Sequence, residues 1–134
     1  MRVTIRRPLS ALRAEAAPYG RCGQLAMMSS ATYPAIAPGG PAVLEKRAYA
    51  FLREVGGRQL TISDDLEAAA LSGRREVEER ALRAGLDLLL YARSESAAAR
   101  AHRRILLAVR AGRLSPGTIV RGAERVRALV SRRA

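Results

Sequence analysis

Three short apolar runs alternate with longer stretches in which apolar residues recur at helical spacing. The runs cover residues 24–29, 59–63 and 86–91, and each is apolar on both faces. Strands with that pattern are covered by helices on both sides or close into a barrel. Helical periodicity predicts helices at about 42–55, 74–84 and 95–111, and a last helix from residue 116. The pattern therefore predicts an α/β fold with three parallel strands.

Residues that start or stop helices stand at the ends of these stretches. Gly56-Gly57, Gly85 and Gly112 each follow a predicted helix, where glycine is the usual stop. Ser94 is placed to cap the third helix, and Ser115-Pro116 opens the last one with proline at its first position. We expect the last helix to turn its apolar residues inward: Ile119, Val120, Ala123, Val126, Leu129 and Val130.

The 134 residues suit a single domain, and a 49% apolar content is enough for a core. Residues 1–23 are a lead-in segment, in which Ser10 can cap a short helix through Ala16 that Pro18 ends. Residues 24–134 hold three βα units and the C-terminal helix. Within them, residues 34–41 carry three prolines and two glycines and are predicted to be a loop that starts with a rigid turn at Tyr33-Pro34.

The net charge raises the question of an anionic partner. Twenty-four basic and 12 acidic residues give a formal charge of +12, and Lys46 is the only lysine. Residues 100–134 carry ten arginines against one acid, Glu124, but the aromatic residues that would stack on bases all lie elsewhere. A bias in the coding sequence also explains such arginine usage. We expect a solvated outer surface with only weak, non-specific affinity for nucleic acid at low salt.

Several classes of protein are excluded by what the chain lacks. Cys22 is the only cysteine, so neither an internal disulfide nor a Cys-rich metal cluster is expected, and a small packing residue is the simplest role for it. His102, the only histidine, falls on a predicted helix and is expected at the surface. Neither a secretory signal nor an apolar run of membrane-spanning length occurs. We expect a cytoplasmic chain without metal, cofactor or membrane contact.

The second apolar run ends in two adjacent carboxylates, Asp64 and Asp65. The carboxyl end of a parallel strand is where α/β enzymes present catalytic groups. Adjacent acids after a strand are also common as a helix cap with a first-turn charge, and spacing alone leaves both readings open. The third aspartate, Asp87, lies within the third run. There it is either a satisfied internal acceptor or at a solvated strand start.

Several ordered blocks resemble glycoside hydrolase family 3, most of all its β-N-acetylhexosaminidase branch. The first is Met-Met-Ser-Ser-Ala-Thr-Tyr-Pro at residues 27–34, and the second is Leu-Thr-Ile-Ser-Asp-Asp-Leu at residues 60–66. The third is Arg-Ala-Leu-Arg-Ala-Gly-Leu-Asp-Leu-Leu-Leu at residues 80–90, followed by the tail Val-Arg-Ala-Gly-Arg-Leu-Ser at residues 109–115. The resemblance extends from about Pro8 to Leu129.

The resemblance implies a partial (β/α)8 TIM barrel, in which the three runs are strands six, seven and eight. It implies that Asp64 is the nucleophile of a retaining glycosidase that acts on N-acetylglucosamine-containing glycans. Met28 and Ser30 would lie beside the sugar, although many members have histidine at the position of Ser30. Asp65 would be a structural neighbour that orients the site.

The family's Lys-His-Phe-Pro-Gly-His block and its Asp-x-His acid/base loop have no equivalent in this sequence. We therefore expect a truncated hydrolase segment that is inactive alone, since positioned acid–base catalysis is commonly worth ~10²–10⁴-fold. Three strands cannot close a barrel, so the chain would form homo-oligomers, pair with a complementary half-barrel or fold poorly. The alternative is a non-catalytic, basic interaction or oligomerisation module built on the same scaffold.

Overall fold

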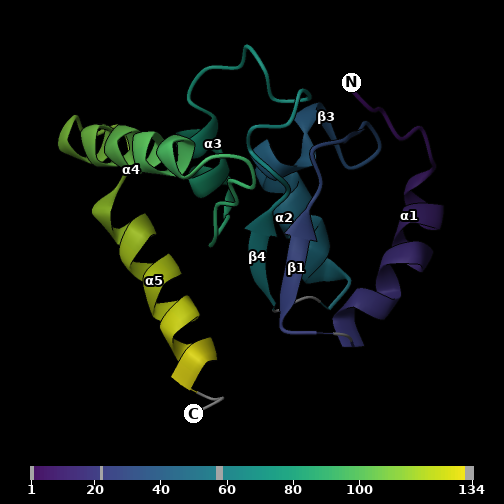
Figure 1. The fold of residues 1–134 in the computed structure, drawn as a ribbon. Coiled ribbons are helices and arrows are strands. Elements are labelled where there is room, and N and C mark those ends of the chain that lie inside the picture. The colour runs from purple at the N-terminus through teal and green to yellow at the C-terminus, as the bar shows by residue number, and fades with distance from the viewer. Residues whose placement is uncertain (1, 22, 57–58, 132–134) are drawn as a thin grey trace.

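The computed structural model describes residues 2–21, 23–56 and 59–131. In these ranges it is an α/β structure with a parallel strand pair at its centre. Helix α2 lies behind the pair, α1 stands on one side, and α4 and α5 extend on the other (Figure 1). The elements are, in order, α1 (Leu9–Ala16), η1 (Ala17–Arg21), β1 (Leu25–Met28), β2 (Thr32–Tyr33), β3 (Ala37–Pro41), η2 (Ala42–Leu44), α2 (Lys46–Glu54), β4 (Leu60–Ser63), α3 (Val77–Ala84), α4 (Glu95–Arg110) and α5 (Pro116–Ser131).

The first two apolar runs form the parallel pair, as predicted. β1 and β4 align from Leu25 opposite Leu60 to Met28 opposite Ser63. The third run lies parallel to β4 on its other side, but a single bridge between Ile62 and Leu88 is the only ladder pairing it makes in the described residues. The prediction of three regular strands was therefore wrong for the third.

Side chains interrupt the third ladder. The Thr61 amide donates to Asp87 Oδ2 at 2.8 Å, and the Leu90 amide donates to Ser63 Oγ at 2.9 Å. In the third run, Leu88 makes both main-chain hydrogen bonds of a parallel ladder. Its amide donates to Thr61 O at 2.9 Å, and its carbonyl accepts from the Ser63 amide at 3.0 Å. Because two side chains replace main-chain partners, the run stays extended without becoming a regular strand.

The proline- and glycine-rich stretch predicted as a loop forms part of an antiparallel pair. Strand β3 pairs with β2, with Thr32 opposite Pro41 and Tyr33 opposite Ala37, and a register shift lies between the two pairs. The turn between them begins at Tyr33, whose carbonyl accepts from the Ile36 amide at 2.9 Å, so the predicted turn is present. The composition concealed the strand because prolines are tolerated where a strand has a free edge or an irregular register.

The structure confirms several of the residues that were predicted to start or end helices. Ser94 Oγ accepts from the Ala97 amide at 3.2 Å and caps α4, and Pro116 is the first residue of α5. Gly56, Gly85 and Gly112 follow their helices with positive φ values of 98°, 127° and 69°. Gly57 lies outside the described residues.

The helix starts were less accurate. The helix expected from residue 42 opens as the 3-10 turn η2, and the one expected from residue 74 begins only at Val77. Helix α1 starts at Leu9, one residue before Ser10, and the chain continues through Pro18 as η1.

The main core lies between the strand pair, α2 and α3. Tyr49 is its largest fully buried side chain, and its hydroxyl donates to Val43 O at 2.8 Å. A smaller cluster joins Leu82 of α3 to Ala108 of α4 and to Leu114. Gly85 allows the close approach of the third run, because a Cβ there would lie 3.4 Å from the Tyr49 ring.

Helix α5 buries none of its residues, contrary to the prediction. Val120 and Val130 are 52% and 63% exposed, while Ile119, Val126 and Leu129 are only partly covered. In Figure 1 this helix runs away from α4 along one side of the molecule, so it meets too little neighbouring structure to cover its apolar face. No helix in the described ranges has the length and apolar character needed to cross a bilayer.

Candidate active site

Asp64 and Ser30 come together because β1 and β4 are parallel and end at the same edge. Ser30 follows β1 by two residues, and Asp64 follows β4 directly. The Asp64 amide donates to Met28 O at 3.2 Å, which ties the two strand ends together. Residues far apart in sequence therefore form one surface.

A cavity of about 470 Å³ opens at this edge. Its polar wall consists of Asp64, Ser29, Ser30 and Tyr33, and its apolar wall consists of Val3, Ile5, Ala31 and Ala68–Ala70. Ser30 is only 8% exposed, and its hydroxyl has no hydrogen-bond partner among the described residues. A buried hydroxyl without a partner costs about 1–3 kcal/mol, so Ser30 is suited to bind a polar ligand group.

Asp64 and Asp65 have different surroundings. Asp64 is partly exposed, and its Oδ1 accepts from the Asp65 amide at 2.8 Å. Asp65 Oδ1 accepts from the amides of Glu67 at 3.0 Å and Ala92 at 3.4 Å, and its Oδ2 pairs with Arg93 Nε at 3.2 Å. Asp65 therefore connects the loop after β4 to the end of the third run, whereas Asp64 can meet a ligand in the cavity.

Met28 occupies a different place from the other predicted site residues. Its side chain is 6% exposed and belongs to the main core, and it lines a separate cavity between β1 and α1. Its carbonyl, which accepts from Asp64, is its link to the cavity edge. The role predicted for Met28 beside a sugar stays a prediction.

The start of the chain forms one wall of the Asp64 cavity. Thr4 bridges to Thr32 in parallel, the Ile5 amide donates to Thr32 O at 2.8 Å, and the Thr32 amide donates to Val3 O at 2.9 Å. Val3 and Ile5 thereby reach the cavity. Sequence reasoning placed these residues in a lead-in segment, since nothing in their local pattern indicates the partner strand.

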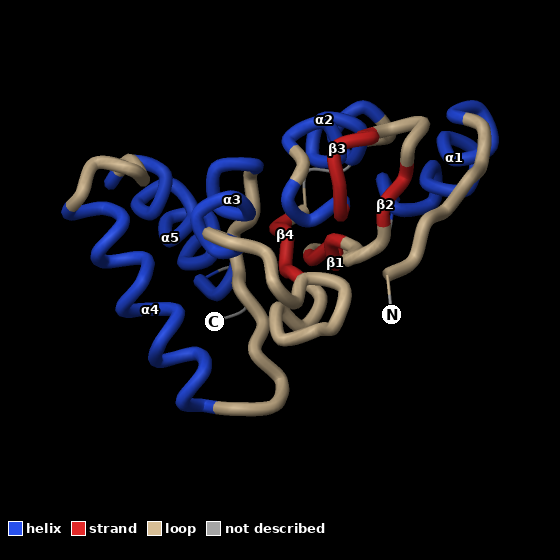
Figure 2. The backbone as a smooth tube through the Cα atoms, turned by 90° about the horizontal axis from the view of Figure 1, so that it is seen from above, coloured by secondary structure: helices blue, strands red, loops and turns tan. Residues whose placement is uncertain are grey.

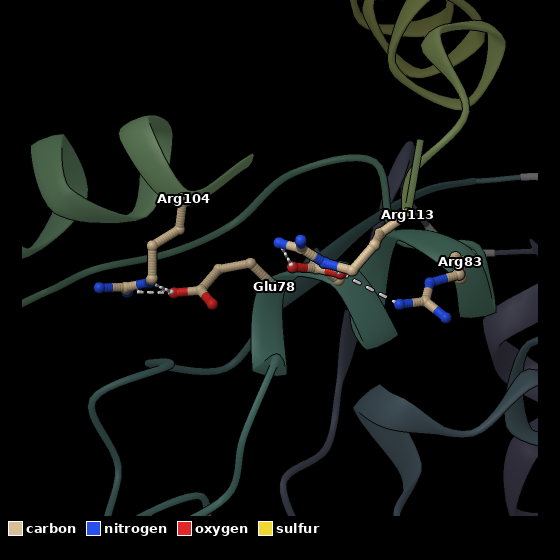
Figure 3. A network of polar contacts seen from close by, with 5 residues as sticks. Glu78, Arg83, Arg104 and Arg113 are labelled. Atoms are coloured by element: carbon tan, nitrogen blue, oxygen red, sulfur yellow. Dashed lines mark hydrogen bonds and ion pairs between the residues drawn. The ribbon is translucent and has the colours of Figure 1, made fainter. Parts of the chain in front are cut away.

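Two buried glutamates of α3, Glu78 and Glu79, pair with arginines from later segments. Figure 3 shows Glu78 beside Arg104. Glu78 accepts from Arg104 of α4 and from the Tyr91 hydroxyl at 2.7 Å. Burial raises the pKa of Glu78, but the hydrogen bonds from Arg104 and Tyr91 outweigh it and hold the pKa below its usual value. Burial, and then the hydrogen bond to Glu78, raise the pKa of the Tyr91 hydroxyl.

Glu79 forms the second half of this network. It accepts from Arg113 at 3.1 and 3.2 Å in a two-point contact and from Arg83 at 3.2 Å. Glu79 is only 5% exposed, although charged residues of an amphipathic helix usually lie on its solvent face. Its partner Arg113 lies 34 residues away, so no local pattern could have revealed the pair.

The Asp87 carboxylate is enclosed and hydrogen-bonded, which confirms one of the two interpretations that the sequence left open. Its carboxylate accepts from the Thr61 amide and hydroxyl at 2.8 and 2.9 Å and pairs with Arg125 of α5 at 3.2 Å. His102 is exposed on α4, as predicted. Cys22 lies outside the described residues. Within the described ranges, no three His, Cys, Asp or Glu residues gather as metal ligands would.

By sequence, the chain matches no protein family model and no curated protein. By structure, it is similar to a glycoside hydrolase family 3 β-N-acetylglucosaminidase from Paenibacillus sp. str. FPU-7, with 28% identity and a TM-score of 0.86 over 97% of this chain and 27% of that one. It is also similar to a family 3 glycosyl hydrolase from Mycobacterium smegmatis, with 26% identity and a TM-score of 0.76 over 91% of this chain and 42% of that one.

A β-N-acetylglucosaminidase from Thermotoga maritima shares the fold at 18% identity, with a TM-score of 0.78 over 96% of this chain and 31% of that one. The fold is thus that of part of a family 3 glycoside hydrolase. The resemblance to the β-N-acetylhexosaminidase branch of that family is confirmed by structure. The chain spans less than half of the length of each of these three solved structures.

Proposed function

We propose that the chain is a segment of a retaining family 3 glycosidase and carries its nucleophile, Asp64. The observation that supports this best is the cavity that the partly exposed Asp64 and the buried Ser30 both line. The similar enzymes from Paenibacillus and Thermotoga are named β-N-acetylglucosaminidases, so we infer a β-N-acetylglucosaminide as substrate. In this proposal β1, β4 and the third run are the last three strands of a (β/α)8 barrel.

The proposed chemistry has two steps. An Asp64 carboxylate oxygen attacks the anomeric carbon while the bond to the leaving oxygen breaks, which forms a glycosyl-enzyme ester. Water then attacks the same carbon, gives up a proton to the acid/base group that first protonated the leaving oxygen, and releases the Asp64 carboxylate and the free sugar. Ser30 would bind a sugar hydroxyl, Met28 would lie close by, and Asp65 would keep the Asp64 backbone in place.

The general acid of this reaction needs a second source. Among the described residues that line the cavity, Asp64 is the only carboxylate. Asp65 is unsuited to protonate the leaving group, because Arg93 and two backbone amides hold it. We infer that the acid comes from a complementary half-barrel, and that the chain alone is nearly inactive on unactivated glycosides.

A substrate with an activated leaving group tests the nucleophile without the acid. Dinitrophenyl N-acetyl-β-glucosaminide loses a leaving group that departs without protonation, so the chain should form an ester on Asp64 that mass spectrometry of a proteolytic digest detects. Asp64→Asn should abolish labelling, and the matched Asp65→Asn should retain it. Labelling that survives Asp64→Asn, or that maps to another residue, would contradict the assignment.

A non-catalytic interaction module is the second candidate, and the exposed apolar residues of β1 favour it. Leu25 and Met27 are 44% and 59% exposed, which suits a chain that associates with itself or with a half-barrel. The labelling experiment separates the candidates, since a pure interaction module forms no ester on Asp64.

A further inference from the structure

The apolar wall of the Asp64 cavity comes mainly from two segments that are far apart in sequence. Val3 and Ile5 belong to the start of the chain, and Ala68–Ala70 belong to the loop after β4. Seen from above, the first residues run beside β2, and the loop after β4 lies at the ends of β1 and β4 (Figure 2). The wall therefore exists only in the folded chain, next to the strand ends that carry Asp64 and Ser30.

Main-chain hydrogen bonds to Thr32 hold the first segment. The Thr32 amide donates to Val3 O at 2.9 Å, and the Ile5 amide donates to Thr32 O at 2.8 Å. Because side chains alternate along an extended segment, Val3 and Ile5 lie on one face and Thr4 lies on the other. The side chains of Val3 and Ile5 can therefore be changed without loss of the bonds that keep the segment in place.

Two buried leucines anchor the second segment. Leu66 and Leu71 belong to the main core, and the Leu66 amide donates to Leu90 O at 3.0 Å. The Leu71 amide donates to Ala68 O at 2.9 Å, which closes a turn around Ala68–Ala70. These three alanines carry only methyl groups, so this part of the wall is apolar and leaves room for a ligand group.

The charge in the cavity is negative. Among the described residues that line it, Asp64 is the only charged one, although the chain has 24 basic residues. An anionic ligand group would meet the Asp64 carboxylate with no cation to offset the repulsion, and it would also lose hydration against the apolar wall. A neutral, apolar group avoids both costs.

We propose that this wall is the subsite for the aglycone, the group bonded to the leaving oxygen, and that it selects a neutral, apolar aglycone. The inference rests on the proposed function, in which Asp64 attacks the anomeric carbon and the leaving oxygen departs on the other side of that carbon. A sugar ring has hydroxyl groups along most of its edges, and they would lose hydrogen bonds against the wall. The methyl group of an N-acetyl substituent is too small to cover side chains from two segments.

Thioglycosides of N-acetylglucosamine probe the subsite without turnover, because their carbon–sulfur bond resists hydrolysis. The phenyl β-thioglycoside should bind the full chain about tenfold more tightly than the methyl β-thioglycoside, because the wall removes the phenyl ring from water. The 4-carboxyphenyl β-thioglycoside should lose most of this gain, because it brings a second carboxylate into the cavity. Ligand-observed NMR titration measures the three dissociation constants.

The double variant Val3→Thr and Ile5→Thr tests the wall itself. It should reduce the preference for phenyl over methyl to about threefold or less, because a hydroxyl replaces apolar surface, and it should leave binding of the methyl compound unchanged. The double variant Val120→Thr and Val130→Thr is the matched control. Both valines are exposed on α5 and do not line the cavity, so the full preference for phenyl should remain.

Substitution of each aspartate tests the role of charge. Asp64→Asn should restore binding of the 4-carboxyphenyl compound, whereas Asp65→Asn should not, because Arg93 already pairs with the Asp65 carboxylate. Equal affinities for the phenyl and methyl compounds, an equal loss in the α5 control, or no binding of any compound would overturn the inference. Weaker binding of both compounds to the Val3 and Ile5 variant would also overturn it and would assign the wall to the sugar.

These outcomes are separable from the labelling of Asp64. Ester formation at Asp64 without a preference for the phenyl compound would contradict the aglycone subsite alone. A preference for the phenyl compound without ester formation would support the apolar subsite and contradict only the nucleophile.

Discussion

At the residue scale, two adjacent carboxylates have different surroundings. Asp65 is held by Arg93 and by the amides of Glu67 and Ala92, while Asp64 accepts only from the neighbouring amide and faces a cavity. The Asp65 amide donates to one Asp64 oxygen at 2.8 Å, and the nucleophile that we propose would use the other oxygen. The buried Glu78 shows how such environments also set the response of the fold to pH.

Glu78 should make the free energy of unfolding depend on pH in the acid range. Its folded-state pKa is lowered, because hydrogen bonds from Arg104 and Tyr91 exceed the effect of burial. Its contribution is therefore present above the unfolded pKa, near 4.3 for glutamate, and is lost as pH falls through the lower folded pKa. Glu78→Gln should cost about 1–2 kcal/mol at neutral pH, a modest value because Arg104 is half-exposed.

Urea unfolding between pH 7 and pH 2 measures this effect. The difference in unfolding free energy between wild type and Glu78→Gln should shrink below about pH 4. Glu124→Gln is the matched control, because Glu124 is exposed on α5, and it should change stability little at any pH. A difference that stays constant across the acid range would contradict the assigned role of Glu78.

At the element scale, Asp87 decides how the third run attaches to β4. It replaces main-chain carbonyls as the acceptor for Thr61, and it also pairs with Arg125 of α5. One side chain therefore joins three elements that are far apart in sequence. The Thr61 amide depends on this carboxylate, whereas the Thr61 hydroxyl is also within hydrogen-bond distance of the Gly85 carbonyl, at 3.1 Å.

Asp87→Ala should destabilise the chain by about 1–3 kcal/mol, since it leaves the Thr61 amide buried without its acceptor. Arg125→Gln should cost less, because Arg125 is half-exposed and water can take the place of its pair. Urea midpoints at unchanged m-value measure both effects. Equal losses in the two variants would show that the ion pair, rather than the Thr61 contacts, carries the stabilisation.

At the scale of the whole molecule, the positive charge is divided between internal pairs and open surface. Arg104, Arg113 and Arg125 bind carboxylates of α3 and the third run. Arg103 and Arg110 are exposed on α4. The first group stabilises the fold, and the second is available to an anionic partner.

Heparin chromatography tests that division. The chain should be retained at low salt and elute as salt rises, because the contact is screened and non-specific. The double variant Arg103→Gln and Arg110→Gln should elute earlier without losing stability. If the wild-type chain elutes completely at a salt concentration well below the physiological one, this expectation is wrong.

Local features of the chain were predictable from sequence because nearby residues determine them. The apolar runs of β1 and β4, the Ser94 cap, Pro116 at the start of α5 and the helix-ending Gly85 depend on a few neighbouring positions each. The ordered blocks likewise indicated the family whose structures the chain resembles, and they singled out Asp64. Its adjacency to Asp65 was visible from the start, but the difference between them was not.

Only the tertiary structure decided the rest, because each feature depends on a partner distant in sequence. Glu78 and Glu79 are buried because arginines arrive from α4 and from the turn before α5. The third run is irregular because the side chains of Asp87 and Ser63 enter its ladder. Residues 3–5 reach the Asp64 cavity because Thr32 holds them. The sequence alone determined which segments are apolar and where the carboxylates stand, and long-range contacts decided which of them meet.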